Sequence, residues 1–177
     1  KLMRLVFGTK LTQFHEYRLM ILNEDEETNP ERQLLEEDDG AISRALSRYT
    51  NQILNARFLT FQNCLLTDLP PNNASSISLL NTDTENIDNI QGVKFVNIQH
   101  CKVRNFQALS DCLYFDSKKA GIQDISYMTN ARFMCLVEEP LKHVANLQNL
   151  SRLFLTDCKE LISLSDLPSL VTLSIKG

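Results

Sequence analysis

The chain has 177 residues, of which 43% are apolar and 23% are charged, and its net charge at pH 7 is −4. This length is enough for one substantial domain, and the acidic balance gives no electrostatic reason to expect nucleic acid as a partner. No apolar run is long enough to span a membrane as a helix. Because the chain begins with Lys1 and stops inside a repeat, we expect it to be a fragment of a longer protein.

The first 55 residues predict a mainly helical region. Residues 1–7 alternate weakly and are compatible with a strand, whereas the apolar spacing over 11–22 is helical and Thr12 is a suitable cap. Pro30 follows a turn signal and can open a further helix. Residues 41–56 are amphipathic, and we expect this helix to close the open end of the structure that follows.

Residues 24–39 form an acidic stretch, with nine carboxylates against one arginine. One interpretation is an acidic contact surface or a cation site. The spacing of these carboxylates lacks the pattern of a calcium-binding loop. We therefore favour a solvated loop or connection.

From Ala56 onward an apolar pattern recurs about every 19 residues. The pattern begins at Ala56, Ala74, Val93, Cys112, Ala131 and Leu150, and a partial copy begins at Leu170. In the third copy the predicted inward residues are Val93, Val96, Ile98, Val103, Phe106 and Leu109. Of the 36 inward positions in the six complete copies, 33 are apolar and the exceptions are Asn72, Thr84 and Ser117. The overall composition would fill only about 15 of these positions, so the pattern is an internal repeat.

This repeat resembles the short repeats of the leucine-rich repeat family. The resemblance covers 56–177 and implies a curved α/β solenoid with a parallel sheet on its concave side. The apolar period of three on the return path predicts a 3₁₀ or irregular convex side. Residues 1–55 are then a helical N-terminal cap, which makes two regions with a boundary after residue 55.

The family normally has Asn at one turn position, where the side chain satisfies backbone groups. That column here contains Cys64, Thr82, Cys101, Ala120, Glu139 and Cys158. Cys and Thr can do part of this work because each has a small donor. Ala120 cannot, and Pro140 follows Glu139, so we expect those two turns to be irregular and loosened.

The five cysteines favour an intracellular location, in the cytoplasm or nucleus. Cys64, Cys101 and Cys158 share one column, and separations of about 10 and 15 Å are too long for a disulfide. Cys112 falls in an inward column and Cys135 in an outward one, so neither is expected to pair. Free thiols favour a reducing compartment, although the family resemblance also admits a secreted effector.

The outward positions of the predicted strands suggest a binding surface. One column brings Phe95, Tyr114 and Phe133 side by side, with Arg152 next in the column and Phe154 beside it. An aromatic stripe is costly to leave in water, and aromatics and Arg are enriched at binding hot spots. The alternative is that the rings pack on one another or lie under the N-terminal segment. The polar residues expected around the stripe are Asn97, Asp116 and Lys118.

Patterns typical of catalysis or metal binding are absent from the sequence. It contains no CxxC, HExxH, glycine-rich phosphate loop or Ser-His-Asp order, and His15, His100 and His143 fall in three different settings. We therefore predict no catalytic residue, no metal site and no cofactor, and hence no enzyme activity.

The function predicted is that of a non-catalytic protein-protein interaction module, or scaffold, which binds a protein or peptide on its concave face. One alternative is the substrate-recruiting portion of a larger enzyme complex, for example a ubiquitin ligase or phosphatase regulator. Others are a pathogen effector, and a spacer whose stripe is covered by the chain itself. The sequence carries no signal of the oligomeric state.

Overall fold

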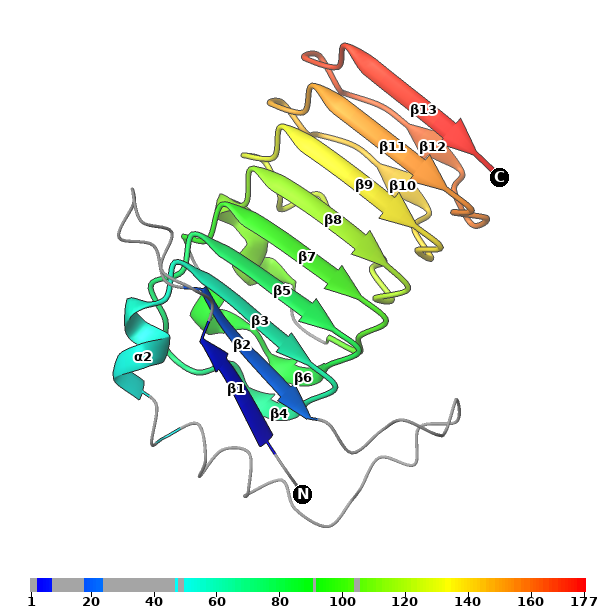
Figure 1. The fold of residues 1–177 in the computed structure, drawn as a ribbon. Coiled ribbons are helices and arrows are strands. Elements are labelled where there is room, and N and C mark those ends of the chain that lie inside the picture. Colours follow the sequence, from blue (N-terminus) through cyan, green and yellow to red (C-terminus); the bar gives the residue numbers. More distant parts are fainter. Residues whose placement is uncertain (1–2, 8–17, 24–46, 48–49, 91, 104–105) are drawn as a thin grey trace.

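The chain forms a solenoid of stacked strands (Figure 1). The structure, a computed structural model, describes residues 3–7, 18–23, 47, 50–90, 92–103 and 106–177. The predictions for the acidic residues 24–39, for a cap at Thr12 and for a helix opened by Pro30 lie outside the described residues. Within the described ranges, no helix is both long enough and apolar enough to cross a membrane.

Nine strands form the main sheet, in the order β1-β2-β3-β5-β7-β8-β9-β11-β13. Their bounds are β1 Met3–Phe7, β2 Arg18–Asn23, β3 Phe58–Gln62, β5 Ser76–Leu80, β7 Phe95–Gln99, β8 Tyr114–Lys118, β9 Phe133–Val137, β11 Arg152–Thr156 and β13 Thr172–Lys176. β1 pairs antiparallel with β2, and every other pair is parallel. From β3 to β13 the strands begin 18, 19, 19, 19, 19 and 20 residues apart, so the predicted repeat spacing is confirmed.

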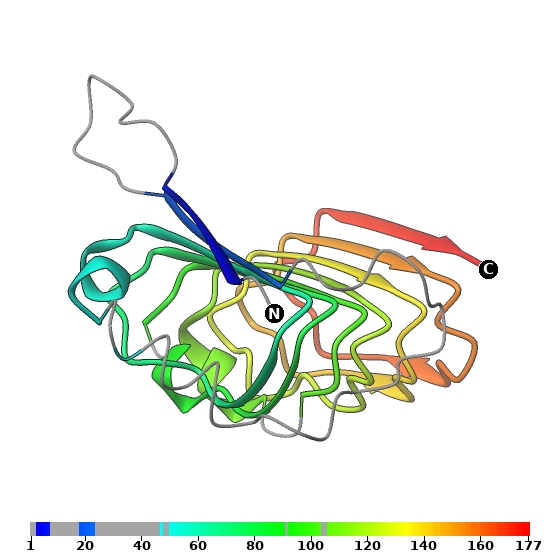
Figure 2. The same cartoon turned by 60° about the horizontal axis from the view of Figure 1, so that its bottom comes forward.

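Each main strand from β3 to β11 is followed by a return path on the other side of the core (Figure 2). This path contains two 3₁₀ helices, η1 Asp88–Ile90 and η2 Gln107–Asp111. It also contains two small parallel sheets, β4 Leu65–Asp68 with β6 Asp83–Asn86, and β10 His143–Val144 with β12 Ser163–Leu164. The 3₁₀ and irregular path agrees with the apolar period of three, whereas the short strands were not predicted.

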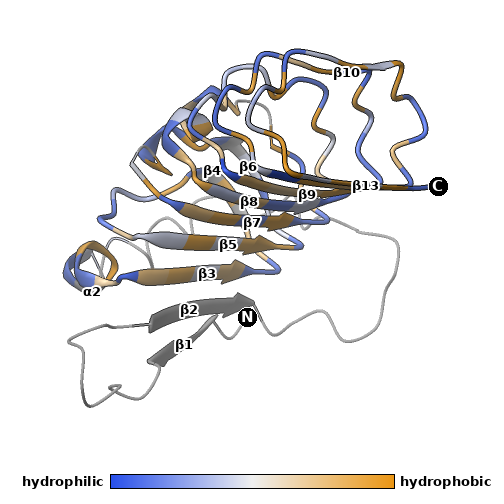
Figure 3. Cartoon of the chain, turned by 90° about the horizontal axis from the view of Figure 1, so that it is seen from above, coloured by the Kyte–Doolittle hydropathy of each residue, from blue (hydrophilic) through white to orange (hydrophobic). Residues whose placement is uncertain are grey.

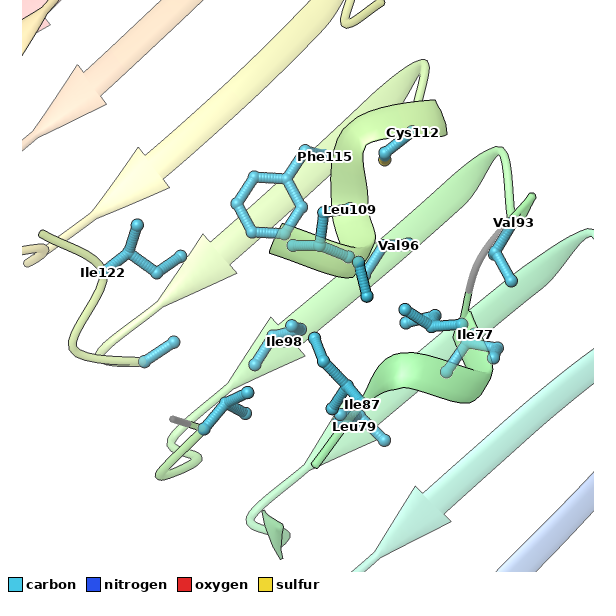
Figure 4. Packing of buried hydrophobic residues seen from close by; sticks show 14 of the residues in the cluster. Ile77, Leu79, Ile87, Val93, Val96, Ile98, Leu109, Cys112, Phe115 and Ile122 are labelled. Atoms are coloured by element: carbon cyan, nitrogen blue, oxygen red, sulfur yellow. The ribbon is translucent and has the colours of Figure 1, made fainter. Parts of the chain in front are cut away.

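Alternation along the strands separates the core from the outer sheet face. In β7, Val96 and Ile98 are buried while Phe95 is exposed. The same alternation recurs in β5, β8, β9 and β11, and the buried residues form one cluster through the stack. Figure 4 shows Val96, Ile98 and Phe115 on the side of the strands that the return path covers. Figure 3 shows hydrophobic residues along the strands and hydrophilic residues in many of the connecting turns.

A ladder of side chains satisfies the backbone where the strands end. The Cys64 N–H donates to Thr82 Oγ1, and the Thr82 N–H donates to Cys101 Sγ, each at 3.3 Å. The thiols of Cys64 and Cys101 and the hydroxyl of Thr82 donate in turn to backbone carbonyls. The role expected for Cys and Thr in this column is therefore confirmed.

The turns at Ala120 and Glu139 are regular, so the prediction that they loosen is wrong. Glu139 is buried, and its two carboxylate oxygens accept hydrogen bonds from the N–H groups of Ala120 and Ile122, each at 2.9 Å. A side chain from the following turn thus supplies the acceptor that Ala120 lacks. The prediction failed because it assumed that the side chain at this position hydrogen-bonds only to backbone groups of its own turn.

The residue that follows each of six main strands has a positive φ angle, between 50° and 56°. These residues are Asn63, Asn81, His100, Lys119, Glu138 and Asp157. Non-glycine residues adopt this conformation at a cost. The backbone N–H of each donates to the last residue of the next main strand, as the His100 N–H does to the Lys118 carbonyl at 2.7 Å. The regular stacking of turns offsets the local strain.

Part of the region predicted as a helical N-terminal cap is strand. Residues 18–22, assigned to the helix over 11–22, belong to β2, whose Leu19 and Ile21 pair with Leu59 and Phe61 of β3. Without β2, the edge of β3 would leave backbone groups unpaired, and this tertiary pairing overrides a weak helical spacing. The helix predicted over 11–22 is thus wrong for 18–22.

Two other N-terminal predictions agree with the structure. The strand considered for residues 1–7 is present as β1. The helix expected over 41–56 is described at Ser47 and in α2 Thr50–Asn55, where Ile53 is fully buried against the first repeat. The division of the chain into two regions after residue 55 stays a prediction.

Candidate binding surface

The outward positions of the main strands form one continuous surface, which we call the open face. In β5, β7, β8, β9 and β11 the first, third and fifth residues are exposed or half-buried. In Figure 1 these strands lie in front of the return path. Thr60 in β3 also occupies an outward column, yet it is buried.

The open face carries a stack of rings, which we call the aromatic column: Phe95, Tyr114 and Phe133. The ring centroids of Phe95 and Tyr114 are 4.8 Å apart with an interplanar angle of 11°, and those of Tyr114 and Phe133 are 6.3 Å apart at 29°. Parallel pairing puts the three residues at the same register of adjacent strands. The repeat therefore positions the rings, as the sequence predicted.

The rings cover part of one another and still remain accessible. Phe95 is 46% exposed and Tyr114 is 38% exposed, although stacked rings lose area to each other. Because the rings of Phe95 and Tyr114 stack face to face, a bound partner would contact mainly the edges of these rings. The ring edges therefore form an apolar ridge. Apolar side chains of a partner can pack against this ridge, whereas a flat ring system cannot insert between the two stacked faces.

Arg152 and Phe154 extend the aromatic column toward β11. The Arg152 guanidinium carbon lies 5.8 Å from the Phe133 ring centroid, a cation–π distance. The Phe154 ring is 5.6 Å from that of Phe133, at an angle of 39°. All five residues predicted as the centre of the surface therefore lie together.

A shallow hollow of about 210 Å³ opens beside the aromatic column. Its lining consists of Ser76, Phe95, Val96, Asn97, Tyr114, Phe115, Asp116 and Phe133. Small-molecule sites usually occupy about 300–1,000 Å³ and enclose most of the ligand. The hollow is smaller and suits one side chain of a partner.

Polar groups stand next to the rings in the second outward column. The Asn97 Oδ1 accepts a hydrogen bond from Gln99 Nε2 at 3.0 Å, which leaves the Asn97 amide donors for other contacts. Asn97 is in register with Asp116, and Asp116 with Cys135. Lys118, half-buried, lies at the end of β8 in the third column. These residues can therefore supply the polar contacts predicted around the stripe.

Asp116 and Cys135 shape the electrostatics of this surface. Burial raises the pKa of the Asp116 carboxyl, and a hydrogen bond with Cys135 opposes that shift. Burial, together with the Asp116 charge, raises the pKa of the Cys135 thiol, which therefore stays protonated at neutral pH. Among the described residues, none forms an ion pair with Asp116.

The thiols and histidines among the described residues show no arrangement for nucleophilic chemistry. All five cysteines are free, and burial raises the pKa of Cys64 and of Cys112 to about 12. His143 Nδ1 lies 2.9 Å from Ser163 Oγ on the return path, away from the open face. Among the described residues no group of three His, Cys, Asp or Glu side chains could hold a metal ion. That the chain is not an enzyme stays a prediction.

A regular series of three cations, each directly before a main strand, was missed by the sequence analysis. Arg57, Lys94 and Arg132 immediately precede β3, β7 and β9, at equivalent backbone positions that hydrogen bonds link from strand to strand. We call these three residues the basic row. In the sequence, the row is marked by a cation directly before a Phe in every second repeat. That these cations occupy equivalent positions is evident only once the strands are aligned.

Comparisons with models of known families, with curated proteins and with solved structures gave no match to this chain. The fold and surface therefore define its class as a parallel β-solenoid of about six turns that presents an aromatic column on an open sheet face.

Proposed function

We propose that the chain is a non-catalytic interaction module of the leucine-rich repeat type. In this proposal another protein or peptide binds on the open face, which is the concave side of the solenoid, through Phe95, Tyr114, Phe133, Arg152 and Phe154. The observation that carries the proposal is the exposure of a stacked aromatic column on a sheet. Contiguous exposed aromatic surface beside Arg is typical of binding hot spots.

The neighbouring residues support recognition of a polypeptide. The hollow beside the column suits a single side chain, and Asn97 and Asp116, which line it, offer a donor and an acceptor. Lys118, at the end of β8, offers a positive charge. A sheet built from paired strands holds these groups in place before a partner arrives, which lowers the entropic cost of binding.

Three features support the family assignment. The strands recur at about 19 residues, the return path uses 3₁₀ helices, and side chains at one turn position satisfy the backbone of neighbouring turns. The five free cysteines support an intracellular location, in the cytoplasm or nucleus.

Affinity capture from a cell lysate tests the proposal. The chain is compared with a variant carrying Phe95→Ser, Tyr114→Ser and Phe133→Ser, after circular dichroism has shown that both are folded. We expect a protein that the unmodified chain retains and the triple variant loses. Identical capture by the two forms would contradict the proposal.

A matched control distinguishes specific contacts from non-specific adhesion to exposed apolar residues. Ile162 and Val171 are exposed apolar residues outside the aromatic column. A variant with Ile162→Ser and Val171→Ser removes exposed apolar area without touching the column. We expect it to capture the same protein as the unmodified chain, and joint loss in both variants would indicate non-specific adhesion.

A second candidate is that the column only stabilises the sheet. The close stacking of Phe95 on Tyr114 favours it, because cross-strand aromatic pairs contribute about 0.2–1 kcal/mol each. This candidate predicts that the triple variant unfolds more easily and captures the same proteins. The single substitution Phe95→Ser, at the exposed end of the stack, keeps the comparison informative if the triple variant does not fold.

A further inference from the structure

The outward positions of the repeat strands carry a single carboxylate. These positions are the first, third and fifth residues of each main strand from β3 to β13, and Asp116 is the only Asp or Glu among them. It is the third residue of β8 and lies in register with Asn97 of β7 and Cys135 of β9. Both neighbours are uncharged, because burial keeps the Cys135 thiol protonated. The negative charge of Asp116 is thus isolated within the sheet.

The Asp116 carboxylate has more hydrogen-bonding capacity than the described chain uses. An ionised carboxylate offers about four lone-pair sites, and a thiol is a weak donor. Cys135 supplies such a thiol, while Lys118, two residues further along β8, forms no ion pair with Asp116. The carboxylate is half-buried, and its loss of hydration disfavours the charged form and raises its pKa. A cation from a partner would offset this cost.

The hollow beside the aromatic column joins this carboxylate to apolar surface. Asp116 is the one lining residue that is charged at neutral pH, and most of the others are aromatic or aliphatic. The volume of about 210 Å³ admits a single side chain. Lys and Arg lay an apolar stem along apolar surface and keep a charged head at its border. The hollow and Asp116 therefore match the two parts of one basic side chain.

We propose that the open face recognises one basic side chain of its partner, whose apolar stem lies in the hollow against Phe95 and Tyr114 and whose charged head pairs with Asp116. Asp116 is then the residue that determines specificity, because it selects a partner segment with Lys or Arg at this point. The inference rests on the proposed function, since it uses the same open face and names the chemistry of the partner.

The neighbouring charges limit the partner to a single basic residue at the hollow. Lys118 ends β8, and the Arg152 guanidinium carbon lies 5.8 Å from the Phe133 ring centroid. Further basic residues beside the first would meet these like charges, which is unfavourable. The segment recognised is therefore one basic residue between neutral ones, rather than a polybasic stretch.

An apolar side chain is the alternative occupant of the hollow. It would fill the same volume and contact the same ring edges. It would also remove water from Asp116 without supplying a cation, and an unpaired charge that loses its hydration is costly. Charge complementarity therefore favours the basic side chain.

NMR titration of the isotopically labelled 177-residue chain tests the need for charge. The probes are peptides of sequence GAXAG with blocked ends, in which X is lysine, acetyl-lysine or norleucine. Acetyl-lysine keeps the stem and loses the charge, and norleucine keeps the stem alone. We expect the lysine peptide to shift the amide resonances of Asn97 and Asp116. It should bind about 3- to 10-fold more tightly than either neutral peptide.

Matched variants test the role of Asp116. Asp116→Asn keeps the shape of the side chain and removes its charge, so the affinity for the lysine peptide should fall to that for the acetyl-lysine peptide. Asp166→Asn makes the same change at an exposed position between β12 and β13. Its affinity should stay within about twofold, because it alters the net charge equally but away from the hollow. Circular dichroism checks that both variants are folded.

A polybasic peptide, GKKKG with blocked ends, controls for general attraction to the acidic chain. The whole chain has a net charge of −4, so attraction without a specific site would grow with the charge of the peptide. We expect GKKKG to bind no more tightly than GAKAG, since Lys118 and Arg152 repel the added lysines. Tighter binding of GKKKG would overturn the proposal.

The proposal is also overturned if the lysine peptide does not bind, if it binds no better than the neutral peptides, or if both Asp variants weaken it equally. Tighter binding of the norleucine peptide would assign the hollow to an apolar side chain instead. Failure here is distinguishable from failure of the proposed function. If the triple aromatic variant loses a captured protein that the Asp116→Asn variant retains, only the basic side chain is wrong.

Discussion

Two neighbouring strands of the solenoid carry the same pattern and bury it very differently. Leu153 and Leu155 of β11 are fully buried, whereas Leu173 and Ile175, their partners in β13, are 47% and 57% exposed. The side chains are similar and point the same way. The difference is that β11 lies between β9 and β13, while β13 pairs, within the described chain, only with β11.

This comparison shows that the inward side chains of a turn are fully buried only when another turn packs on each side of it. In a solenoid each turn contacts mainly the turns on either side, so stability is close to a sum of turn and interface contributions. The repeat pattern thus predicts which side chains point inward. How much an inward side chain contributes to stability depends on the position of its turn in the stack.

The largest expected effect comes from the matched pair Leu153→Ala and Leu173→Ala. Leu153→Ala should lower the free energy of unfolding by about 2–5 kcal/mol, because it removes buried methyl groups and leaves a cavity. Leu173→Ala should cost less than about 1 kcal/mol, since much of that side chain already contacts water. Urea unfolding followed by circular dichroism measures both, and equal losses would contradict the dependence on neighbours.

A second prediction concerns a contact that passes between turns. Glu139→Ala should lower the free energy of unfolding by about 2–4 kcal/mol, because the N–H groups of Ala120 and Ile122 lose their buried acceptor. Hydrogen exchange should show these two amides losing protection first. Glu160→Ala removes an exposed carboxylate and serves as the control. Similar hydrogen exchange in both variants would contradict the role of Glu139 as acceptor for these two amides.

A smaller change of opposite sign is expected at Ser117. Its hydroxyl is buried in an inward column and has no hydrogen-bond partner among the residues that the structure describes. Ser117→Ala should raise the free energy of unfolding by about 1 kcal/mol, since it removes an unsatisfied polar group from the core. Ser165→Ala, at an exposed position, should leave the urea midpoint unchanged. A lower midpoint for the Ser117 variant would reveal a partner for the hydroxyl.

The smallest effect is expected at the exposed border of the open face. The Lys119 ammonium lies 3.0 Å from a Glu138 oxygen, and this hydrogen bond lowers the pKa of the Glu138 carboxyl. The pair therefore stabilises the fold above the ordinary pKa of glutamate, and the stabilisation is lost as the pH falls through the lowered value. In Lys119→Ala, an NMR titration should move the Glu138 midpoint upward. An unmoved midpoint would show that Lys119 does not cause the shift.

The sequence predicted the strands of the repeat and the residues of the aromatic column for one physical reason. Strand alternation has a period of two, so fixing Val96 and Ile98 inward also fixes Phe95 outward, and the repeat aligns Tyr114 and Phe133 beside it. The stacking angles were beyond reach, because rotamers depend on neighbouring side chains in three dimensions.

The features that were missed all involve interactions between distant segments. Residues 18–23 become a strand because β3 offers an edge, Glu139 serves a turn 19 residues earlier, and the basic row joins residues 37 and 38 positions apart. None of these is visible in a local window of sequence. Each follows from the register of stacked turns.

The parallel pairing of the main strands has a mechanical consequence. Its hydrogen bonds run roughly along the stack, so a force that pulls β3 and β13 apart would load these bonds directly. Extension would then proceed as a series of small, similar steps of one turn each, which makes this solenoid a compliant element under tension.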